Sequence, residues 1–170
     1  MLINRFILQP QIQTMDYNRI VAVTGLPGLY EVLSSKADGA IVRSLEDQST
    51  KFVASRVHNL SHLESIEVYT TRDNVTLADV FNSMKENKEA LPDVKDNKAL
   101  QGYFEKVYPD MDFERVYSSD MKKMIKWYRQ LKANDVEIKL SQVDQADEEE
   151  QAVEVTEPDT QVSAAEKPVE

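Results

Sequence analysis

Two histidines have the spacing of metal ligands. His58 and His62 are four residues apart, and a helix would place both imidazoles on one face, as in many zinc sites. Glu64 is the nearest carboxylate. The segment lies between two expected strands, however, so its sequence predicts a loop or a single turn, and no third ligand can be named. We therefore expect two surface histidines and no metal.

A loop rich in glycine and proline is the most distinctive local pattern. It reads Thr-Gly-Leu-Pro-Gly-Leu-Tyr and ends at Tyr30. Gly25 and Gly28 permit positive φ, and Pro27 fixes its own φ. Such a loop could let a ligand approach closely, with Tyr30 and Tyr69 as an aromatic surface. A tight connection between strands explains the same residues, and turns use Gly and Pro more often than binding sites do. Because no Gly-Lys-Ser/Thr follows, this is not a phosphate loop.

A predicted helix near the end of the folded part is basic. Between Met121 and Lys132 it has five bases and no acid: Lys122, Lys123, Lys126, Arg129 and Lys132. Most of them share one side of the helix, beside an apolar stripe. That side could contact nucleic acid or an acidic partner, or the chain's own acidic tail could fold back onto it. A solvated outer face explains the charges without any ligand.

Catalysis finds little support. The sequence has no Gly-x-Ser-x-Gly and no His-Glu-x-x-His motif. It also has no cysteine, which excludes a thiol nucleophile, a disulfide and a cysteine-ligated metal. Carboxylates are plentiful, but their spacing does not place two of them at working distance. We expect neither an enzyme nor a cofactor.

Nearly all the net charge lies at the C-terminus. The 170 residues carry −10, and the stretch from Asp144 to Glu170 contributes −9 of it, which leaves −1 for the rest. This stretch has no Phe, Tyr, Trp, Leu or Ile, so it cannot bury enough apolar surface to fold. We predict a disordered acidic tail over residues 136–170. A nucleic-acid partner is disfavoured, because the folded part lacks a strongly positive field.

The first fourteen residues differ in pattern from the rest of the chain. Their apolar cluster is short and no small-residue cleavage site comes after it, so residues 1–14 do not form a signal peptide. We interpret Met15 as the natural start and residues 1–14 as a mis-assigned extension. The sequence has no run of 18 apolar residues, so we expect a cytoplasmic protein without a membrane partner.

Short strands are predicted between residues 19 and 70. They cover 20–23, 29–33, 40–45, 51–54 and 66–70. The last has strict alternation of apolar and polar residues and is the strongest strand prediction. The Asp38-Gly39 pair is a hairpin signal. Strands this short, joined by tight turns, favour a small barrel or a curled sheet.

The periodicity becomes helical at Thr76. Thr76 and Asp79 have capping-box spacing, Asp96 can cap a second helix, and Ser118 or Ser119 can cap a third. The third helix has one apolar face, formed by Met121, Met124, Ile125, Tyr128 and Leu131. The segment 136–143 is either a last strand or the start of the tail.

Several of these segments resemble an uncharacterised bacterial family known only as a domain of unknown function. The resemblance is carried by GLPGLY at 25–30, VRSLED at 42–47 and LESIEVYTT at 63–71. The helical part, with DFERVYSSD at 112–120, resembles the companion C-terminal domain. The resemblance covers roughly residues 15–133 and implies an SH3-like barrel for the first domain. It implies no activity, cofactor or catalytic residue.

The sequence thus predicts an α+β protein. A small SH3-like β-barrel spans 15–75, a three-helix region spans 76–135, and an acidic tail comes last. We expect a non-catalytic binding or adaptor protein with an unidentified protein partner. Its contact surface would comprise Gly25, Pro27, Gly28, Tyr30, Tyr69, Lys122, Lys126 and Arg129. The alternative is a nucleic-acid-associated protein whose acidic tail screens the basic helix.

Overall fold

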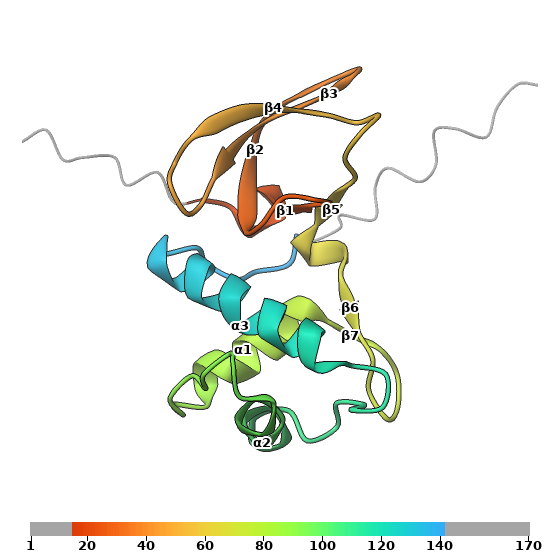
Figure 1. Cartoon of the computed structure of the whole chain (residues 1–170), viewed down its shortest axis with the longest axis vertical. Helices are drawn as coiled ribbons and strands as arrows, with labels where there is room; N and C mark the ends of the chain where they lie inside the picture. The colour runs from red at the N-terminus through yellow and green to blue at the C-terminus, as the bar shows by residue number, and fades with distance from the viewer. Residues whose placement is uncertain (1–14, 142–170) are drawn as a thin grey trace, which may run out of the picture.

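A computed structural model describes residues 15–141 of the chain. The predicted extension at 1–14 and the acidic stretch from Asp144 onward lie outside the described residues. The structure is mixed α+β, as predicted, with a five-stranded antiparallel sheet and three helices. Figure 1 shows the sheet at one end, α3 and α1 below it, and α2 at the opposite end.

The first half of the chain forms the sheet. Its strands are β1 (Ile20–Val23), β2 (Leu29–Lys36), β3 (Gly39–Ser44), β4 (Thr50–Ala54) and β5 (Leu60–His62). Their order across the sheet is β4-β3-β2-β1-β5. The predicted hairpin at Asp38-Gly39 is formed, because Lys36 pairs with Gly39 at the end of β2 and β3.

The sheet is curled but open. Its edges are β4 and β5, and no pairing between these two strands closes a barrel within residues 15–141. A register shift between Val32 and Ser34 interrupts the pairing of β2 with β3, and such a bulge bends a strand and increases its twist. Of the small barrel or curled sheet that the sequence favoured, the structure has an open, curled sheet whose last strand is only three residues long.

The fifth strand is not where the sequence predicted it. Residues 60–62 were expected to be a loop, yet they form β5 and pair with β1. Of residues 66–70, only β6 (Glu67–Val68) is a strand, and it pairs with β7 (Val75–Thr76) in a separate ribbon. The alternation arises because Ile66 and Val68 pack on the helical core, whereas Glu67 and Tyr69 are exposed.

Strand β1 is buried on both faces. Val21 and Val23 pack inside the curled sheet with Tyr30 and Val42. Ile20 belongs instead to the larger cluster that contains the helical side chains. This two-sided burial explains the continuous apolar sequence of β1, in contrast to the alternation of a half-exposed strand.

The helices begin and end close to their predicted limits. They are α1 (Leu77–Glu86), α2 (Asn97–Val107) and α3 (Ser118–Ala133). Thr76 and Asp79 form the predicted capping box, and the Asp96 carboxylate accepts hydrogen bonds from two backbone N–H groups. The predicted apolar face of α3 is buried at all five positions. None of the described helices has the length and apolarity needed to cross a membrane.

The start of α3 differs from the prediction. Neither serine is the N-cap, because Ser118 is already the first helical residue. The Asp120 carboxylate accepts a hydrogen bond of 3.2 Å from the Tyr117 backbone N–H, which makes Tyr117 the N-cap.

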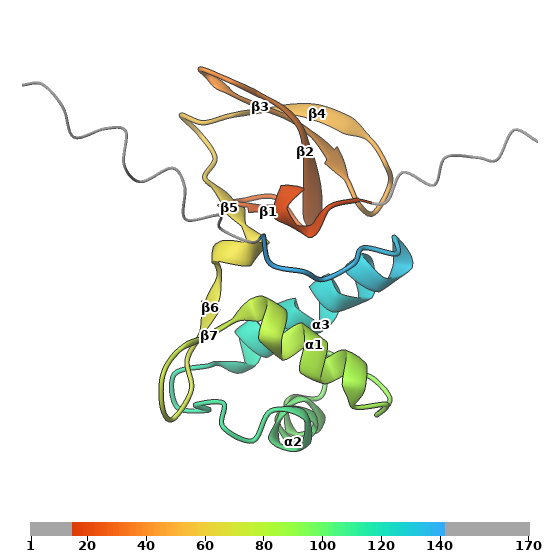
Figure 2. The same ribbon diagram turned by 180° about the vertical axis from the view of Figure 1, so that it is seen from behind.

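The chain after α3 runs back along the molecule, as the view from behind shows (Figure 2). Val136 is buried in the main core, and Glu137 forms a single bridge with Asp16. The Ser141 hydroxyl donates a hydrogen bond of 2.9 Å to the Glu64 carboxylate. Residues 136–141 therefore pack on the folded body without forming a regular strand.

One buried hydroxyl in the helical core allows a test of the packing. The Tyr103 ring packs edge-on against Phe104, with 5.4 Å between ring centroids. Its hydroxyl has no hydrogen-bond partner among the described residues, and burial raises the pKa of Tyr103 to about 12. Because the folded state holds this proton more tightly, the associated stability is complete below the ordinary pKa of 10.0 and is lost as the pH rises toward 12.

We expect Tyr103→Phe to keep or raise the free energy of unfolding at neutral pH, by up to about 1 kcal/mol, since it removes an unpaired buried polar group. The variant should also lose less stability than the parent between neutral and alkaline pH. Urea unfolding at both pH values measures this. A loss above about 1 kcal/mol at neutral pH would mean that the hydroxyl has a partner.

Candidate binding cleft

A cleft of about 760 Å³ lies between the β1–β2 loop and α3. Residues 24–28 line it from the sheet side, and Glu46 lines it from the β3–β4 turn. The α3 side chains that line it are Lys123, Lys126, Trp127, Arg129 and Gln130. Two surfaces that the sequence indicated separately, the glycine-proline loop and the basic helix, therefore share one cavity.

The loop holds its shape through backbone geometry and a buried tyrosine. Gly25 and Gly28 have φ of 82° and 78°, in the left-handed region that favours glycine. The Thr24 backbone N–H donates to the Asn59 carbonyl at 3.0 Å. From beneath the loop, the Tyr30 hydroxyl donates to the Pro27 carbonyl at 3.1 Å. These contacts fix both the beginning and the middle of the loop.

Gln130 fixes the end of the loop against α3. The Leu29 backbone N–H donates to the Gln130 side-chain oxygen at 2.9 Å. A Cβ added at Gly28 would lie 2.9 Å from the Gln130 side-chain nitrogen, a distance at which something must shift. Glycine at position 28 thus supplies both the positive φ and the room for this contact.

A second amide group joins the sheet to the end of α3. The Asn134 side-chain nitrogen donates to the Leu45 carbonyl at 3.0 Å, and Gln48 donates to the Asn134 side-chain oxygen at 3.0 Å. Together with the Gln130 contact, these hydrogen bonds set the distance between the sheet and α3. The walls of the cleft are thereby held before any ligand arrives.

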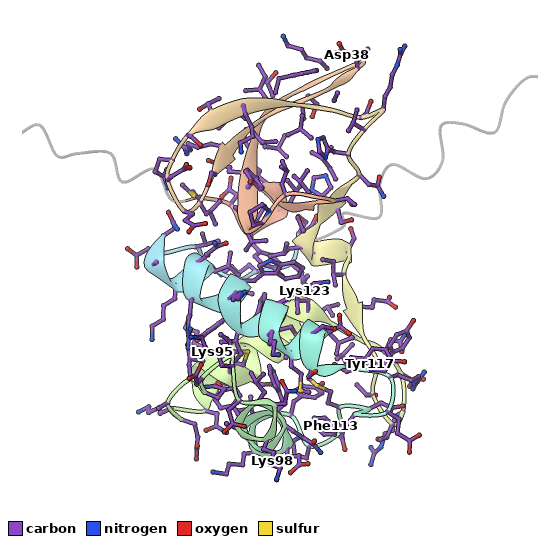
Figure 3. All side chains as sticks on the ribbon, in the orientation of Figure 1. Asp38, Lys95, Lys98, Phe113, Tyr117 and Lys123 are labelled. Atoms are coloured by element: carbon purple, nitrogen blue, oxygen red, sulfur yellow. The ribbon has the colours of Figure 1, made fainter. Side chains whose placement is uncertain are left out.

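Most of the charged side chains that line the cleft are cationic. Lys123 and Lys126 are exposed, and Glu46 is the one acidic side chain among its described lining residues. The Arg129 guanidinium donates to the Pro92 carbonyl at 3.0 Å, so the α1–α2 connection holds it in place. Trp127 adds a half-buried indole. Figure 3 shows Lys123 between the sheet and α3.

The predicted contact residues do not all line the cleft. Those that line the cleft are Gly25, Pro27, Gly28, Lys126 and Arg129, whereas Lys122 does not. Tyr69 lies in a neighbouring pocket that shares Lys123 and Trp127 with the cleft.

Tyr30 is not a contact residue. We expected its ring on an aromatic surface with Tyr69, but it is only 3% exposed. It packs inside the curled sheet and supports the loop from below.

Gln130 was missed by the sequence analysis, and its one sequence signal is an uncharged amide among the bases of α3.

The two histidines lie apart from any ligand cluster. The His58 Nδ1 lies 2.8 Å from the Thr24 carbonyl, and the His62 Nδ1 lies 3.0 Å from the Asn18 carbonyl. Residues 15–141 contain no group of three or more His, Cys, Asp or Glu side chains arranged to hold a metal. In this part of the chain the imidazoles contact the backbone around β1.

Replacing Gly28 tests the contact between loop and helix. We expect Gly28→Ala to lower the free energy of unfolding by roughly 1–3 kcal/mol, through the strained φ and the displaced Gln130. The matched control is Gly25→Ala in the same loop, where φ is 82° but the nearest atom to an added Cβ lies 3.8 Å away. The control should lower stability by roughly 1 kcal/mol, through the positive φ alone. Urea unfolding compares the two, and equal losses would contradict the contact.

Comparison with known proteins agrees with the resemblance seen in the sequence. Residues 18–63 match a family described as domain of unknown function (DUF5606), and residues 66–131 match domain of unknown function (DUF6852). No curated protein matches. A protein from Bacteroides vulgatus, determined by solution NMR in a structural genomics programme, is 31% identical with a TM-score of 0.57. The match covers 71% of this chain and 89% of that one. The chain therefore belongs to an uncharacterised family of domains of unknown function, with DUF5606 followed by DUF6852.

Proposed function

We propose that this protein is a non-catalytic, cytoplasmic binding protein that holds an acidic segment of a protein partner in the cleft between the β1–β2 loop and α3. The observation that carries the proposal is the convergence of the loop with Lys123, Lys126 and Arg129 around one cavity. These side chains come from the opposite wall to the loop, so a bound segment would touch both.

The charge of the cleft favours an acidic ligand. Three bases and one carboxylate, Glu46, line the cavity. Lysine and arginine side chains bind carboxylates through charge-assisted hydrogen bonds, which are stronger than those between neutral groups.

The extent of the positive surface favours a short segment over a nucleic acid. Outside the acidic stretch the chain carries a net charge of −1, so the bases of the cleft form a local patch in a nearly neutral body. Binding to nucleic acid draws on many phosphate contacts and an extended positive field. Three bases beside a loop of fixed conformation match a short peptide segment with a few carboxylates better than a long polyanion.

The curled sheet also supports an SH3-like assignment for the first part of the chain. Its consecutive antiparallel strands and the bulge in β2 are features of small barrels of that type. In this assignment the β1–β2 loop is a connection presented by a rigid scaffold, which is where binding surfaces commonly lie.

Reversing one charge in the cleft tests the function. We expect a fluorescein-labelled oligoglutamate peptide to bind the full chain at low salt, and Lys126→Glu to weaken that binding about tenfold. Fluorescence anisotropy measures the affinity. The matched control is Lys132→Glu, the same change on the same helix outside the cleft, and it should alter the affinity by less than about twofold.

The same assay with single-stranded oligouridylate examines the alternative. A nucleic-acid-associated protein would bind this RNA more tightly than the peptide, with a steep salt dependence, and removal of residues 144–170 would strengthen the binding. That result would replace the proposed function with the alternative. If neither the full chain nor the chain without residues 144–170 binds either probe at low salt, both functions are rejected.

A further inference from the structure

A second, smaller pocket adjoins the cleft on the other side of Lys123 and Trp127. It has a volume of about 270 Å³ and lies between the β6 segment and α3. Its apolar lining comprises Ile66, Val68, Leu77, Val116 and Met124, with Tyr69 at its exposed side. Lys123 and Trp127 line both cavities, so the two lie side by side along α3.

The size of the pocket indicates what it can hold. Sites for cofactors and drug-sized ligands usually measure about 300–1,000 Å³, so this pocket is smaller than that range. Glu67, Arg115, Asp120 and Lys123 also line it, and its apolar part suits a single large hydrophobic side chain. An apolar pocket beside exposed aromatic residues is also typical of interaction sites, and Tyr69 is 48% exposed.

The rim of the pocket is held in place by an arginine. The Arg115 guanidinium lies 4.7 Å from the centre of the Tyr69 ring. It also donates to the Asp112 carboxylate at 2.7 Å and to the Thr70 carbonyl at 2.8 Å. Because these contacts exist without a ligand, the pocket is preorganised, which lowers the entropic cost of binding.

Resting on the proposed function, we infer that the partner segment carries a large apolar residue beside its acidic residues, and that this residue fills the pocket while the acidic residues lie in the cleft. The α3 residues that line the pocket lie between Asp120 and Trp127, and those that line the cleft lie between Lys123 and Gln130. The two sets are therefore displaced by about four residues along the helix. That separation is about 6 Å, or about two residues of an extended peptide.

The composition of the C-terminal acidic stretch favours a partner in trans. The stretch from Asp144 to Glu170 supplies ten acids, but it contains no Phe, Tyr, Trp, Leu or Ile. It can therefore compete for the basic cleft but offers no large side chain to the pocket. The pocket thus distinguishes a partner from the chain's own acidic residues.

Two peptides that differ at one position test the inference on the full chain. One is an oligoglutamate peptide with a single central phenylalanine, and the other has alanine at that position. We expect the phenylalanine peptide to bind about tenfold more tightly, because only it buries a large side chain. It should also change the emission of Trp127, the one tryptophan of the chain, which lines both cavities.

A matched pair of tyrosine variants locates the effect. Tyr69→Ala should bring the two peptides to within about twofold of each other, because it removes the exposed wall of the pocket. The control is Tyr117→Ala, which removes a 65% exposed tyrosine that lines neither cavity and should leave the tenfold difference intact. Figure 3 shows Tyr117 at the start of α3, away from Lys123.

The outcomes separate this inference from the proposed function. Equal binding of the two peptides would overturn the inference and leave the proposed function standing. Binding of neither peptide would overturn the proposed function itself. A preference for phenylalanine that survives Tyr69→Ala without a change in Trp127 emission would place the apolar contact elsewhere and also overturn the inference. Self-association of the chain that is lost in Tyr69→Ala would instead assign the pocket to a second copy.

Discussion

The hydrogen bond from the Leu29 N–H to the Gln130 side chain is the contact on which the candidate site depends. It joins the first residue of β2 to α3 across 101 positions of sequence. Since Gly28 leaves room for the amide, the end of the loop lies directly on the helix. The rest of the loop bends away between this point and Thr24, and the space that it leaves is the cleft.

This contact is stable because the sheet and the helices share one core. Ile20, Leu29 and Leu63 belong to the same buried cluster as the apolar faces of α1, α2 and α3. The segments that match the two family descriptions, 18–63 and 66–131, are therefore one packed unit. Separated from the second segment, the first would expose the helix-facing side of β1 to water, at a cost of about 25 cal/mol for each Å² of apolar surface. The geometry of the cleft and the stability of the fold consequently depend on the same packing.

Local signals in the sequence predicted the local structure. The Thr76 capping box, the Asp96 cap and the apolar face of α3 are each determined within a few residues, and each is confirmed. The strand prediction at 66–70 holds only for Glu67–Val68, which pairs with β7 outside the five-stranded sheet. Alternation reports that one face is buried but not what covers it. The prediction that the Tyr30 ring lies on the surface was wrong. Its position next to the glycine-proline loop does not reveal that the ring points into the curled sheet.

Long-range convergence could not be predicted from spacing, because no local pattern shows that the β1–β2 loop and α3 line the same cavity. The ten acids between Asp144 and Glu170 are covalently attached to the molecule, and tethered groups act at effective concentrations in the millimolar range. Under the proposed function, a partner that offers only negative charge would compete with them for Lys126 and its neighbours. A partner that also filled the pocket beside Tyr69 would gain an apolar contact that those acids do not provide. The proposed binding would therefore discriminate by hydrophobic burial where charge alone would not.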